Sequence, residues 1–439
     1  MNRFRQFCTG RFSVFFFAAT LFSLSVLADA PRNIILMIGD GMGHNHVLAA
    51  DYYEHGETGK QAYQHSGFHA LSMTTFPAGG SYDPEKAWND PKYPPRGVTD
   101  SAAAATALST GAKTKNGMIG LGPEGEPLET MADFAKKTGR VTGLVTTVPV
   151  THATPAGFAA HKQSRNLYTE IANEIIEESP VVVLMGAGHP EYDNSGKPVE
   201  NTDEKSFQYV GGAEMWERLK SGAHPEWQLI QERADAVRLQ TEKADKNKVI
   251  GVFKAEATLQ AGRESADGEP RDDAPYATPL REDVPSLSEI SQAALNHLTN
   301  TGKGFFLMIE GGAIDWTSHN NALGRMIEEQ TGFNGAVSSV VAWIEEHGGW
   351  EQNLLIITAD HETGYLKGPD SAADVENKGA GNLPGVVWTA KGHTNYLVPF
   401  YVRGAGGEEF VNRATGNDPV RGKYIDNTDV AKGIREIWK

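Results

Sequence analysis

Cysteine is almost absent from this chain, whose 439 residues contain only one, Cys8. Cys8 precedes an apolar run near the N-terminus, so cleavage of a leader after that run would leave no cysteine. A chain without cysteine forms no disulfides, and its metal ligands must be oxygen and nitrogen atoms. No second long apolar run follows, so the sequence predicts no membrane-spanning helix beyond the leader.

Positive charge is also scarce. The chain has 40 Lys and Arg residues against 56 Asp and Glu residues, a formal net charge of -16. This balance argues against nucleic-acid binding. It also means that an anionic substrate would need positive charge supplied locally, by metal ions or by an arginine.

Residues 1–30 have the pattern of a secretory signal peptide. Arg3, Arg5 and Arg11 come first, the apolar segment FSVFFFAATLFSLSVL follows, and small residues end the leader at Ala28–Ala30. The apolar segment is too short and too close to the N-terminus for a convincing membrane anchor. We therefore expect an exported protein, periplasmic or secreted, whose mature chain is 31–439.

Buried parallel strands are predicted from short, continuous apolar runs that end abruptly in Gly, Asp, Glu or Thr. These runs are Asn33–Gly41, Val141–Val148, Val181–Gly188, Val249–Phe253, Phe305–Gly312, Leu354–Glu362 and Leu397–Gly404. Helical patterns lie between them, at 129–139, 166–179, 286–302 and 335–349. This alternation predicts an α/β fold, doubly wound, with a mostly parallel central sheet flanked by helices. We expect one domain over 31–439, with surface insertions near 190–247, 262–286 and 367–392.

Three of the predicted strands end in a carboxylate: Asp40, Glu310 and Asp360. Burying a carboxylate at the end of an apolar strand is costly unless it is paired or binds a cation. In an open parallel sheet, ligands bind at the carboxyl ends of the strands. The sequence therefore predicts a metal site where these three residues meet.

Histidines accompany the carboxylates. Asp315 and His319 are four residues apart and share one face of a helix, His361 follows Asp360, and His393 precedes another apolar strand. Each feature alone is common, but their joint occurrence at strand ends favours zinc held by carboxylate and imidazole in a catalytic site. His44 and His46 lie near Asp40 but are expected to be ordinary histidines.

The stretch TDSAAAATALST, 99–110, predicts a helix of small residues that begins at Ser101. The Asp100–Ser101 pair could be only a helix cap. Alternatively, Ser101 is a nucleophile whose negative charge the helix N-terminus would stabilise. A zinc site nearby favours the second interpretation, because a bound metal lowers the pKa of a hydroxyl.

Several motifs resemble those of the alkaline phosphatase family and together span nearly the whole mature chain. They are NIILMIGDGMG, TDSAAAATALSTGAKTKNGMIG, THATPAGFAAHKQSRN, IEGGAIDWTSHNN, TADHETGY and KGHTNYLVPFYVRG. The resemblance implies an alkaline phosphatase catalytic domain, a homodimer, two zinc ions and one magnesium ion. It also implies hydrolysis of phosphate monoesters through a phosphoserine intermediate.

The resemblance assigns roles to individual residues. Ser101 would be the nucleophile, Arg165 would hold two phosphate oxygens, and Asp100 would orient Arg165 or the serine helix. The metal ligands that it implies are Asp315, His319 and His393 for one zinc; Asp360 and His361 for the other, with Asp40 bridging; and Asp40, Thr154 and Glu310 for magnesium.

Two positions vary within the family. His152 stands where other members carry Asp or His, and here it is expected to reach magnesium through water. Trp316 stands where others carry Lys or His; it either packs or replaces a cation near the phosphate, which would weaken retention of product phosphate.

The alternative function is a phosphodiesterase or nucleotide pyrophosphatase of the same superfamily. A sulfatase is disfavoured because the sequence has no C/S-x-P-x-R motif, and a non-catalytic phosphate- or metal-binding protein would need no nucleophile beside the metals.

Overall fold

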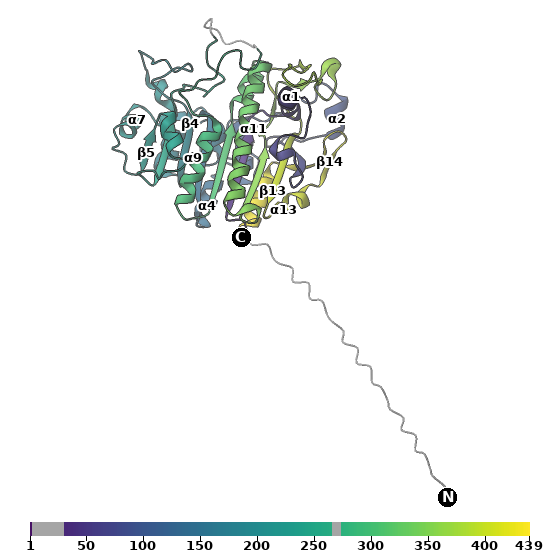
Figure 1. Ribbon diagram of the computed structural model, residues 1–439, viewed down its shortest axis with the longest axis horizontal. Helices are drawn as coiled ribbons and strands as arrows, with labels where there is room; N and C mark the ends of the chain where they lie inside the picture. The colour runs from purple at the N-terminus through teal and green to yellow at the C-terminus, as the bar shows by residue number, and fades with distance from the viewer. Residues whose placement is uncertain (2–29, 266–273) are drawn as a thin grey trace.

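A single large sheet runs through the molecule, with helices on its faces (Figure 1). The computed structural model describes residue 1 and residues 30–265 and 274–439. The eleven strands of this sheet lie in the order β14-β15-β2-β13-β8-β1-β7-β3-β4-β6-β5. Their bounds are β1 Asn33–Gly39, β2 His69–Thr74, β3 Val141–Pro149, β4 Val181–Ala187, β5 Trp227–Ile230, β6 Lys248–Val252, β7 Phe305–Gly311, β8 Asn353–Thr358, β13 Val398–Gly404, β14 Gly416–Asp418 and β15 Gly422–Asp426.

The predicted doubly wound α/β fold is confirmed. The central strands β8, β1, β7, β3 and β4 are all parallel to their neighbours in this group. Strands β1, β7 and β8 are buried at every residue, as their continuous apolar sequences predicted. The carboxyl ends of these three strands therefore lie side by side, which brings together the residues that follow them.

Helices cover the sheet and carry several of the predicted site residues. Their bounds are α1 His44–His55, α2 Pro84–Asn89, α3 Ser101–Thr110, α4 Met131–Lys137, α5 Ala153–Gly157, α6 Tyr168–Asn173, α7 Ala213–Lys220, α8 Arg233–Arg238, α9 Leu287–Asn300, α10 Ala313–His319, α11 Leu323–Glu346, α12 Gly349–Gln352, α13 Glu408–Arg413 and α14 Thr428–Ile437. Helices α9 and α11 pack against each other on the face toward the viewer in Figure 1. No helix in the described ranges has the length and apolar character needed to cross a bilayer.

The alanine-rich helix α3 is buried along almost its whole length. It packs against α5 and α14. A Cβ atom added to Gly157 of α5 would lie only 2.7 Å from the Cβ of Ala105. The small residues of both helices thus permit an approach that larger side chains would block, and this contact fixes the position of Ser101 at the start of α3.

One side of the sheet differs from the sequence-based expectation. Strand β13 runs antiparallel to both β8 and β2, and β14 pairs antiparallel with β15. Strands β2, β5, β14 and β15 were not predicted, because their apolar segments are short or alternate with polar residues. Helix α11 also begins twelve residues before the predicted 335–349 segment. The prediction started too late because Gly332 and Gly335, which lie inside the helix, weaken the helical pattern of the sequence.

The predicted insertions differ in character. The segment 190–247 contains α7 and α8 and also β5, which forms one edge of the central sheet. The segment 367–392 is mostly loop, with a two-stranded pairing of β10 (Leu366–Lys367) and β11 (Val387–Trp388). Part of 262–286 and nearly all of the proposed signal peptide, with Cys8, lie outside the described residues.

Candidate active site

Ser101 is the first residue of α3, and its side chain lies in the interior, with the residue only 3% exposed. Asp100 caps this helix: its Oδ1 accepts a hydrogen bond of 2.9 Å from the Ala103 N–H. The Ser101 hydroxyl lies 3.3 Å from Nε2 of His361. The helix N-terminus favours negative charge at this hydroxyl. Asp100 and Ser101 therefore serve as cap and candidate nucleophile together, and the two interpretations of the motif do not exclude each other.

The three predicted strand-end carboxylates meet at the same edge of the sheet. Asp40 follows β1, Glu310 is the penultimate residue of β7, and Asp360 lies two residues beyond β8. All three are almost fully buried. Within the described part of the chain, both oxygens of Asp40, Oε1 of Glu310 and Oδ2 of Asp360 make no hydrogen bond. Such buried, unpaired oxygens are the donor atoms that a divalent cation requires.

Burial raises the pKa of each of these carboxyls. The pKa of Asp360 rises to about 8 and that of Glu310 to about 7, while that of Asp40 lies well above its ordinary value. For Asp40 and Asp360 the neighbouring carboxylates, Asp315 among them, add to the effect of burial. A bound cation would reverse these shifts by compensating the negative charges. The donor set therefore fits metal ions.

His361 connects two groups of potential metal ligands. In one group, its Nε2 lies 3.2 Å from Oδ2 of Asp360 and 3.5 Å from Oδ1 of Asp40. The other group combines His361 with Asp315 and His393. Each group could place one ligand atom from every member around an ion. The structure thus brings together residues that are more than 350 positions apart in the sequence.

The imidazoles of His319 and His393 are oriented by backbone carbonyls. Nδ1 of His393 lies 2.8 Å from the Thr99 carbonyl oxygen, and Nδ1 of His319 contacts that of Lys391. The two Nε2 atoms face each other at 3.2 Å, and each lies within 3.5 Å of an Asp315 oxygen. An Nδ1–H donated to a carbonyl leaves Nε2 free to bind a metal.

Asp315 differs from the strand-end carboxylates. Its burial alone would raise its pKa, but the hydrogen bond with His319 and the charges of His361 and His393 outweigh burial and hold the pKa below the ordinary value. Correspondingly, Asp315 raises the pKa of His319 to about 9. The part of the site around Asp315 is therefore rich in imidazole, whereas the part around Asp40 is rich in carboxylate.

Thr154 and Arg165 complete the predicted set. Thr154 is fully buried on α5, and its hydroxyl has no hydrogen-bond partner among the described residues, although it lies close enough to lower the pKa of Glu310. Nη1 of Arg165 lies 3.1 Å from Oδ2 of Asp100. Asp100 therefore holds the guanidinium beside the serine helix, and Arg165 is charged and available for an anion.

A family model described as alkaline phosphatase matches residues 31–424. The chain belongs to the alkaline phosphatase family. It is 30% identical to alkaline phosphatase 3 of Bacillus subtilis (strain 168) over an alignment of 348 residues. That alignment covers 78% of this chain and 63% of the Bacillus protein. It is 32% identical to alkaline phosphatase of Escherichia coli (strain K12) over 364 residues, an alignment that covers 79% of this chain and 74% of the Escherichia coli protein. The chain thus spans less than two thirds of the length of the Bacillus relative.

Solved alkaline phosphatases have the same fold. The cold-active enzyme from a psychrophilic Shewanella species aligns with a TM-score of 0.66 and 25% identity, covering 93% of this chain and all of that one. The enzyme of the Antarctic bacterium TAB5 aligns with a TM-score of 0.63 and 24% identity. This alignment covers 94% of the present chain and 100% of the TAB5 chain. The prediction of family and fold from the sequence motifs is confirmed.

His152 and Trp316, the two positions expected to vary within the family, contact each other. Their rings meet edge to face, with centroids 5.6 Å apart. His152 is 8% exposed, and its Nδ1 has no hydrogen-bond partner in the described chain. Burial, with a contribution from Arg165, lowers the pKa of His152 to about 3. His152 is therefore a neutral imidazole at the edge of the candidate active site.

Threonines that support the ligands were not predicted. The Thr363 hydroxyl donates a hydrogen bond of 2.5 Å to Oδ1 of Asp315 and lies 3.2 Å from Nδ1 of His361. The Thr146 hydroxyl donates a hydrogen bond of 2.5 Å to Oε2 of Glu310. Thr363 lies in the TADHETGY motif, two residues after His361, whereas Thr146 lies in none of the motifs and far in sequence from Glu310. His46, expected to be ordinary, lies outside both ligand groups.

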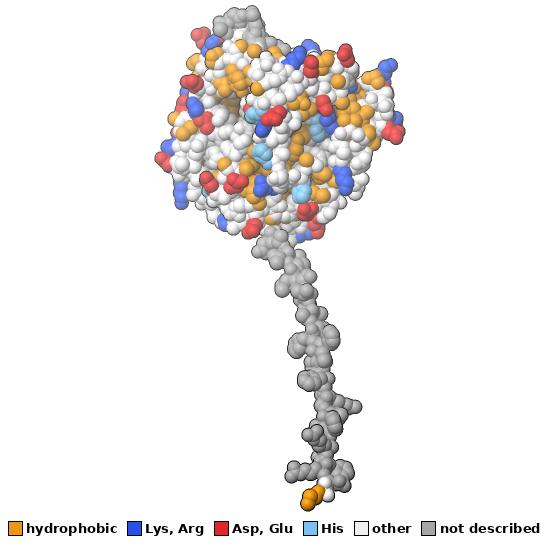
Figure 2. Space-filling model, turned by 45° about the vertical axis from the view of Figure 1, so that its right-hand side comes forward, with side chains coloured by type: hydrophobic (Ala, Val, Ile, Leu, Met, Phe, Trp, Pro, Cys, Tyr) orange, Lys and Arg blue, Asp and Glu red, His pale blue; other side chains and the backbone are white. Residues whose placement is uncertain are grey.

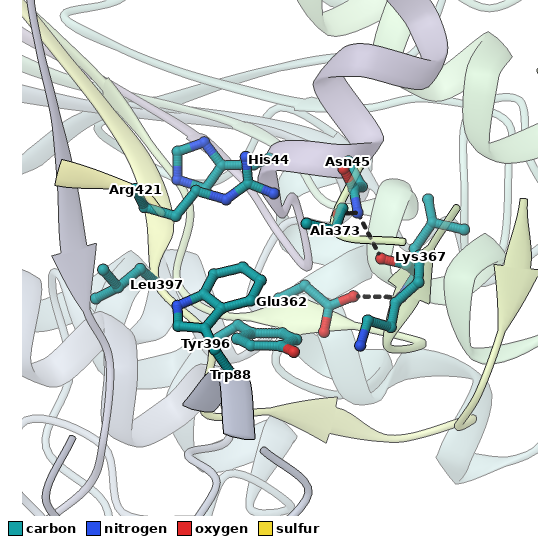
Figure 3. Close-up of a pocket in the computed structure, with 10 residues that line it drawn as sticks. His44, Asn45, Trp88, Glu362, Lys367, Ala373, Tyr396, Leu397 and Arg421 are labelled. Atoms are coloured by element: carbon teal, nitrogen blue, oxygen red, sulfur yellow. Dashed lines mark hydrogen bonds between the residues drawn. The ribbon is translucent and has the colours of Figure 1, made fainter. Parts of the chain in front are cut away.

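A separate pocket is lined by Glu362, the residue that follows the candidate metal ligand His361 (Figure 3). Successive side chains of an extended segment point to opposite sides, so Glu362 faces this pocket while His361 faces Ser101. The rings of Trp88 and Tyr396 lie beside Glu362. The pocket is also lined by His44, Asn45, Leu366, Lys367, Ala373, Leu397 and Arg421. None of the predicted site residues lines it, so it is distinct from the candidate active site.

Proposed function

We propose that the protein hydrolyses phosphate monoesters, releasing an alcohol and inorganic phosphate through a phosphoserine at Ser101. The observation that carries this proposal is the position of the Ser101 hydroxyl, 3.3 Å from His361. His361 belongs to both groups of potential metal ligands. A nucleophile beside a residue shared by two candidate metal sites suits in-line phosphoryl transfer, in which paired metal ions stabilise the attacking and the leaving oxygen.

The residues that would hold the ions are those implied by the family. Asp315, His319 and His393 would hold one zinc ion, and Asp360 and His361 the second, with Asp40 bridging. Asp40, Thr154 and Glu310 would hold magnesium, whose preference for hard oxygen ligands they meet. When bound, such ions stabilise negative charge on oxygen and lower the pKa of a hydroxyl or water.

Ser101 performs the covalent chemistry. Its Oγ forms a bond to phosphorus while the ester P–O bond breaks, and water later cleaves the Oγ–P bond and restores the hydroxyl. The N-terminus of α3 stabilises the negative charge that develops on Oγ. Because two displacements occur at phosphorus, we expect net retention of configuration there.

Arg165 orients the phosphoryl group. Its planar guanidinium can donate two parallel hydrogen bonds to two phosphate oxygens. The contact with Asp100 restricts the guanidinium to a position beside Ser101. We assign Asp100 the positioning of both Arg165 and the serine helix.

The test combines metal content with activity. Purified protein should contain zinc and magnesium near a ratio of two to one and should hydrolyse a simple aryl phosphate. A burst of alcohol product equal to the enzyme concentration would exclude a non-catalytic binding protein. A higher rate on a matched diester than on the monoester would instead establish the alternative, a phosphodiesterase or nucleotide pyrophosphatase.

Export and dimerisation belong to the same proposal. The arginines and the apolar segment of residues 1–30 support cleavage and export to the periplasm or the medium. A homodimer is implied by the resemblance to the family. N-terminal sequencing of the protein from a culture, and light scattering of the purified chain, would test these two points.

A further inference from the structure

Four aromatic rings form a continuous row beside the candidate active site. The centroid of Trp316 lies 5.6 Å from that of His152, the His152 ring stacks on Tyr168 at 6.1 Å with an interplanar angle of 11°, and Tyr168 meets Tyr209 at 4.9 Å. His152 is buried within the row, whereas Trp316, Tyr168 and Tyr209 are half-buried. Trp316, Tyr168 and Tyr209 are therefore partly exposed to solvent.

Two residues of this aromatic row lie close in sequence to residues of the proposed reaction centre, and a hydrogen bond holds a third beside the segment of His152. Trp316 follows Asp315 directly on α10, and Tyr168 begins α6 three residues after Arg165. The hydroxyl of Thr151 donates a hydrogen bond of 3.0 Å to the Tyr209 carbonyl, which fixes the Tyr209 backbone next to the segment that carries His152. Trp316 and Tyr168 therefore connect the row to the segments that carry Asp315 and Arg165, and Tyr209 is its other end.

Electrostatic coupling shows the same proximity. Burial lowers the pKa of Arg165, but Asp100, with a smaller contribution from Tyr168, raises it above its ordinary value. Burial raises the pKa of Tyr209, and Tyr168 and Glu256 add to that effect, whereas the charge of Arg165 opposes it. The rings of Tyr168 and Tyr209 therefore lie within the field of the guanidinium.

We propose that Trp316, Tyr168 and Tyr209 form a leaving-group subsite that favours phosphomonoesters of aromatic alcohols and of nucleosides. This inference rests on the proposed function, because the subsite acts on the alcohol part of the substrate. Tyrosine and tryptophan offer large rigid surfaces with little loss of conformational freedom. A base or aryl ring that stacks on such a surface gains a roughly fivefold to tenfold preference even when the surface is partly open to solvent.

The position of these rings differs from that of aromatic residues that only fill the interior. Phe306 and Phe400, for example, are completely buried in the sheet. Tyr168 and Tyr209 come instead from α6 and from the short helix η3 (Glu204–Val210), outside the central strands. Solvent-accessible rings next to a substrate-binding arginine are available to a ligand, whereas buried ones are not.

The experiment compares two substrates that share the same primary alkoxide leaving group. Metal-loaded enzyme is assayed with adenosine 5′-monophosphate and with the 5-phosphate of methyl ribofuranoside, which lacks the base. We expect kcat/KM for the nucleotide to be roughly tenfold higher. Tyr168→Leu and Tyr209→Leu should each reduce that ratio about threefold or more, while Tyr168→Phe and Tyr209→Phe, which keep the rings, should preserve it.

Two controls separate stacking from folding. Tyr276→Leu replaces an exposed tyrosine on a remote loop and should leave the ratio unchanged. Adenosine should inhibit wild-type enzyme more strongly than methyl ribofuranoside does, a measurement that needs no variant. Equal kcat/KM values for both substrates in the wild type, or a ratio unaffected by both leucine variants, would overturn the subsite while leaving phosphatase activity intact. Failure to hydrolyse either substrate would overturn the proposed function itself.

Discussion

Buried carboxylates occur in two parts of this molecule and are compensated in different ways. At the strand ends, Asp40 and Asp360 keep oxygens that make no hydrogen bond within the described residues. On α11, Glu328 forms a buried ion pair of 2.7 Å with Arg263 and accepts a hydrogen bond of 2.6 Å from the Tyr276 N–H. Arg325 lies 3.6 Å from the same carboxylate.

The comparison shows which buried charges indicate function. The carboxylate on α11 is paired with an arginine of the chain, so it ties Arg263 and Tyr276 to the helix. The strand-end carboxylates lie close to one another and keep several oxygens that make no hydrogen bond within the described residues, a costly arrangement unless a cation binds. The surface shows no comparable cluster of like charges on the face drawn in Figure 2, where acidic and basic side chains are interspersed.

The largest expected effect is at the proposed nucleophile. Ser101→Ala should reduce kcat by about 10⁴-fold or more, because the covalent route is lost. Quenching with a labelled substrate should trap no phosphoprotein, and metal content should stay the same. Labelled phosphoprotein in this variant would contradict the assignment of Ser101.

Asp360→Asn separates charge from shape at the strand ends. The amide oxygen can still accept the hydrogen bonds that Oδ1 of Asp360 receives from Gly41 N–H and His361 N–H. We expect zinc content to fall and activity to drop about 10³-fold, because the charged ligand is lost. In chelator at pH 8 the variant should be more stable than wild type, since an uncompensated buried charge has been removed. If the metal-free Asp360→Asn variant were less stable than metal-free wild type, the strand-end carboxylates would not differ from the paired carboxylate on α11.

Glu328→Gln should give the opposite pattern. Removing one partner of the buried pair should lower the free energy of unfolding by about 3 kcal/mol. Activity per folded molecule should remain within about twofold, because Glu328 belongs to neither group of potential metal ligands. Denaturant unfolding and kcat/KM measure the two effects, with Glu345→Gln at an exposed position of the same helix as the matched control. A large fall in kcat/KM would show that this ion pair is coupled to the active site.

Glu329 predicts a pH dependence of stability that does not involve the metal ligands. Burial, with the adjacent Glu328, raises its pKa from 4.5 to about 7. Because the folded-state pKa is the higher one, its contribution to stability is complete below about pH 4.5 and is lost as pH rises through 7. Glu329→Gln should remove this loss, so the variant should gain about 2 kcal/mol relative to wild type between pH 5 and pH 8. Parallel pH profiles of the two proteins in denaturant would contradict it.

The smallest effect concerns product release. Trp316→Lys would place a cation near the phosphate and should strengthen inhibition by inorganic phosphate about threefold to tenfold. Trp316→Phe should behave like wild type, because it adds no charge. Unchanged phosphate inhibition in Trp316→Lys would show that the indole only packs against His152.

The central strands and the candidate ligands were predictable for local reasons. Continuous apolar runs identified β1, β7 and β8, and the carboxylates that follow them were visible as charged residues at the ends of such runs. The motif around Ser101 likewise indicated both the helix and its cap. The strands β2, β5, β14 and β15, which lie at or near the two edges of the sheet, were missed because short or partly exposed strands have no continuous apolar signal.

The amino-acid sequence alone determined the parallel core, the alanine-rich helix and the set of carboxylates, imidazoles and one hydroxyl available for chemistry, because each depends on residues near one another in the chain. Only the tertiary structure decided that His361 would belong to both ligand groups, that Thr363 would support Asp315, and that Tyr168 and Tyr209 would continue the row from Trp316. Those relations join segments that the sequence separates widely, and the register of parallel strands together with helix packing sets their distances.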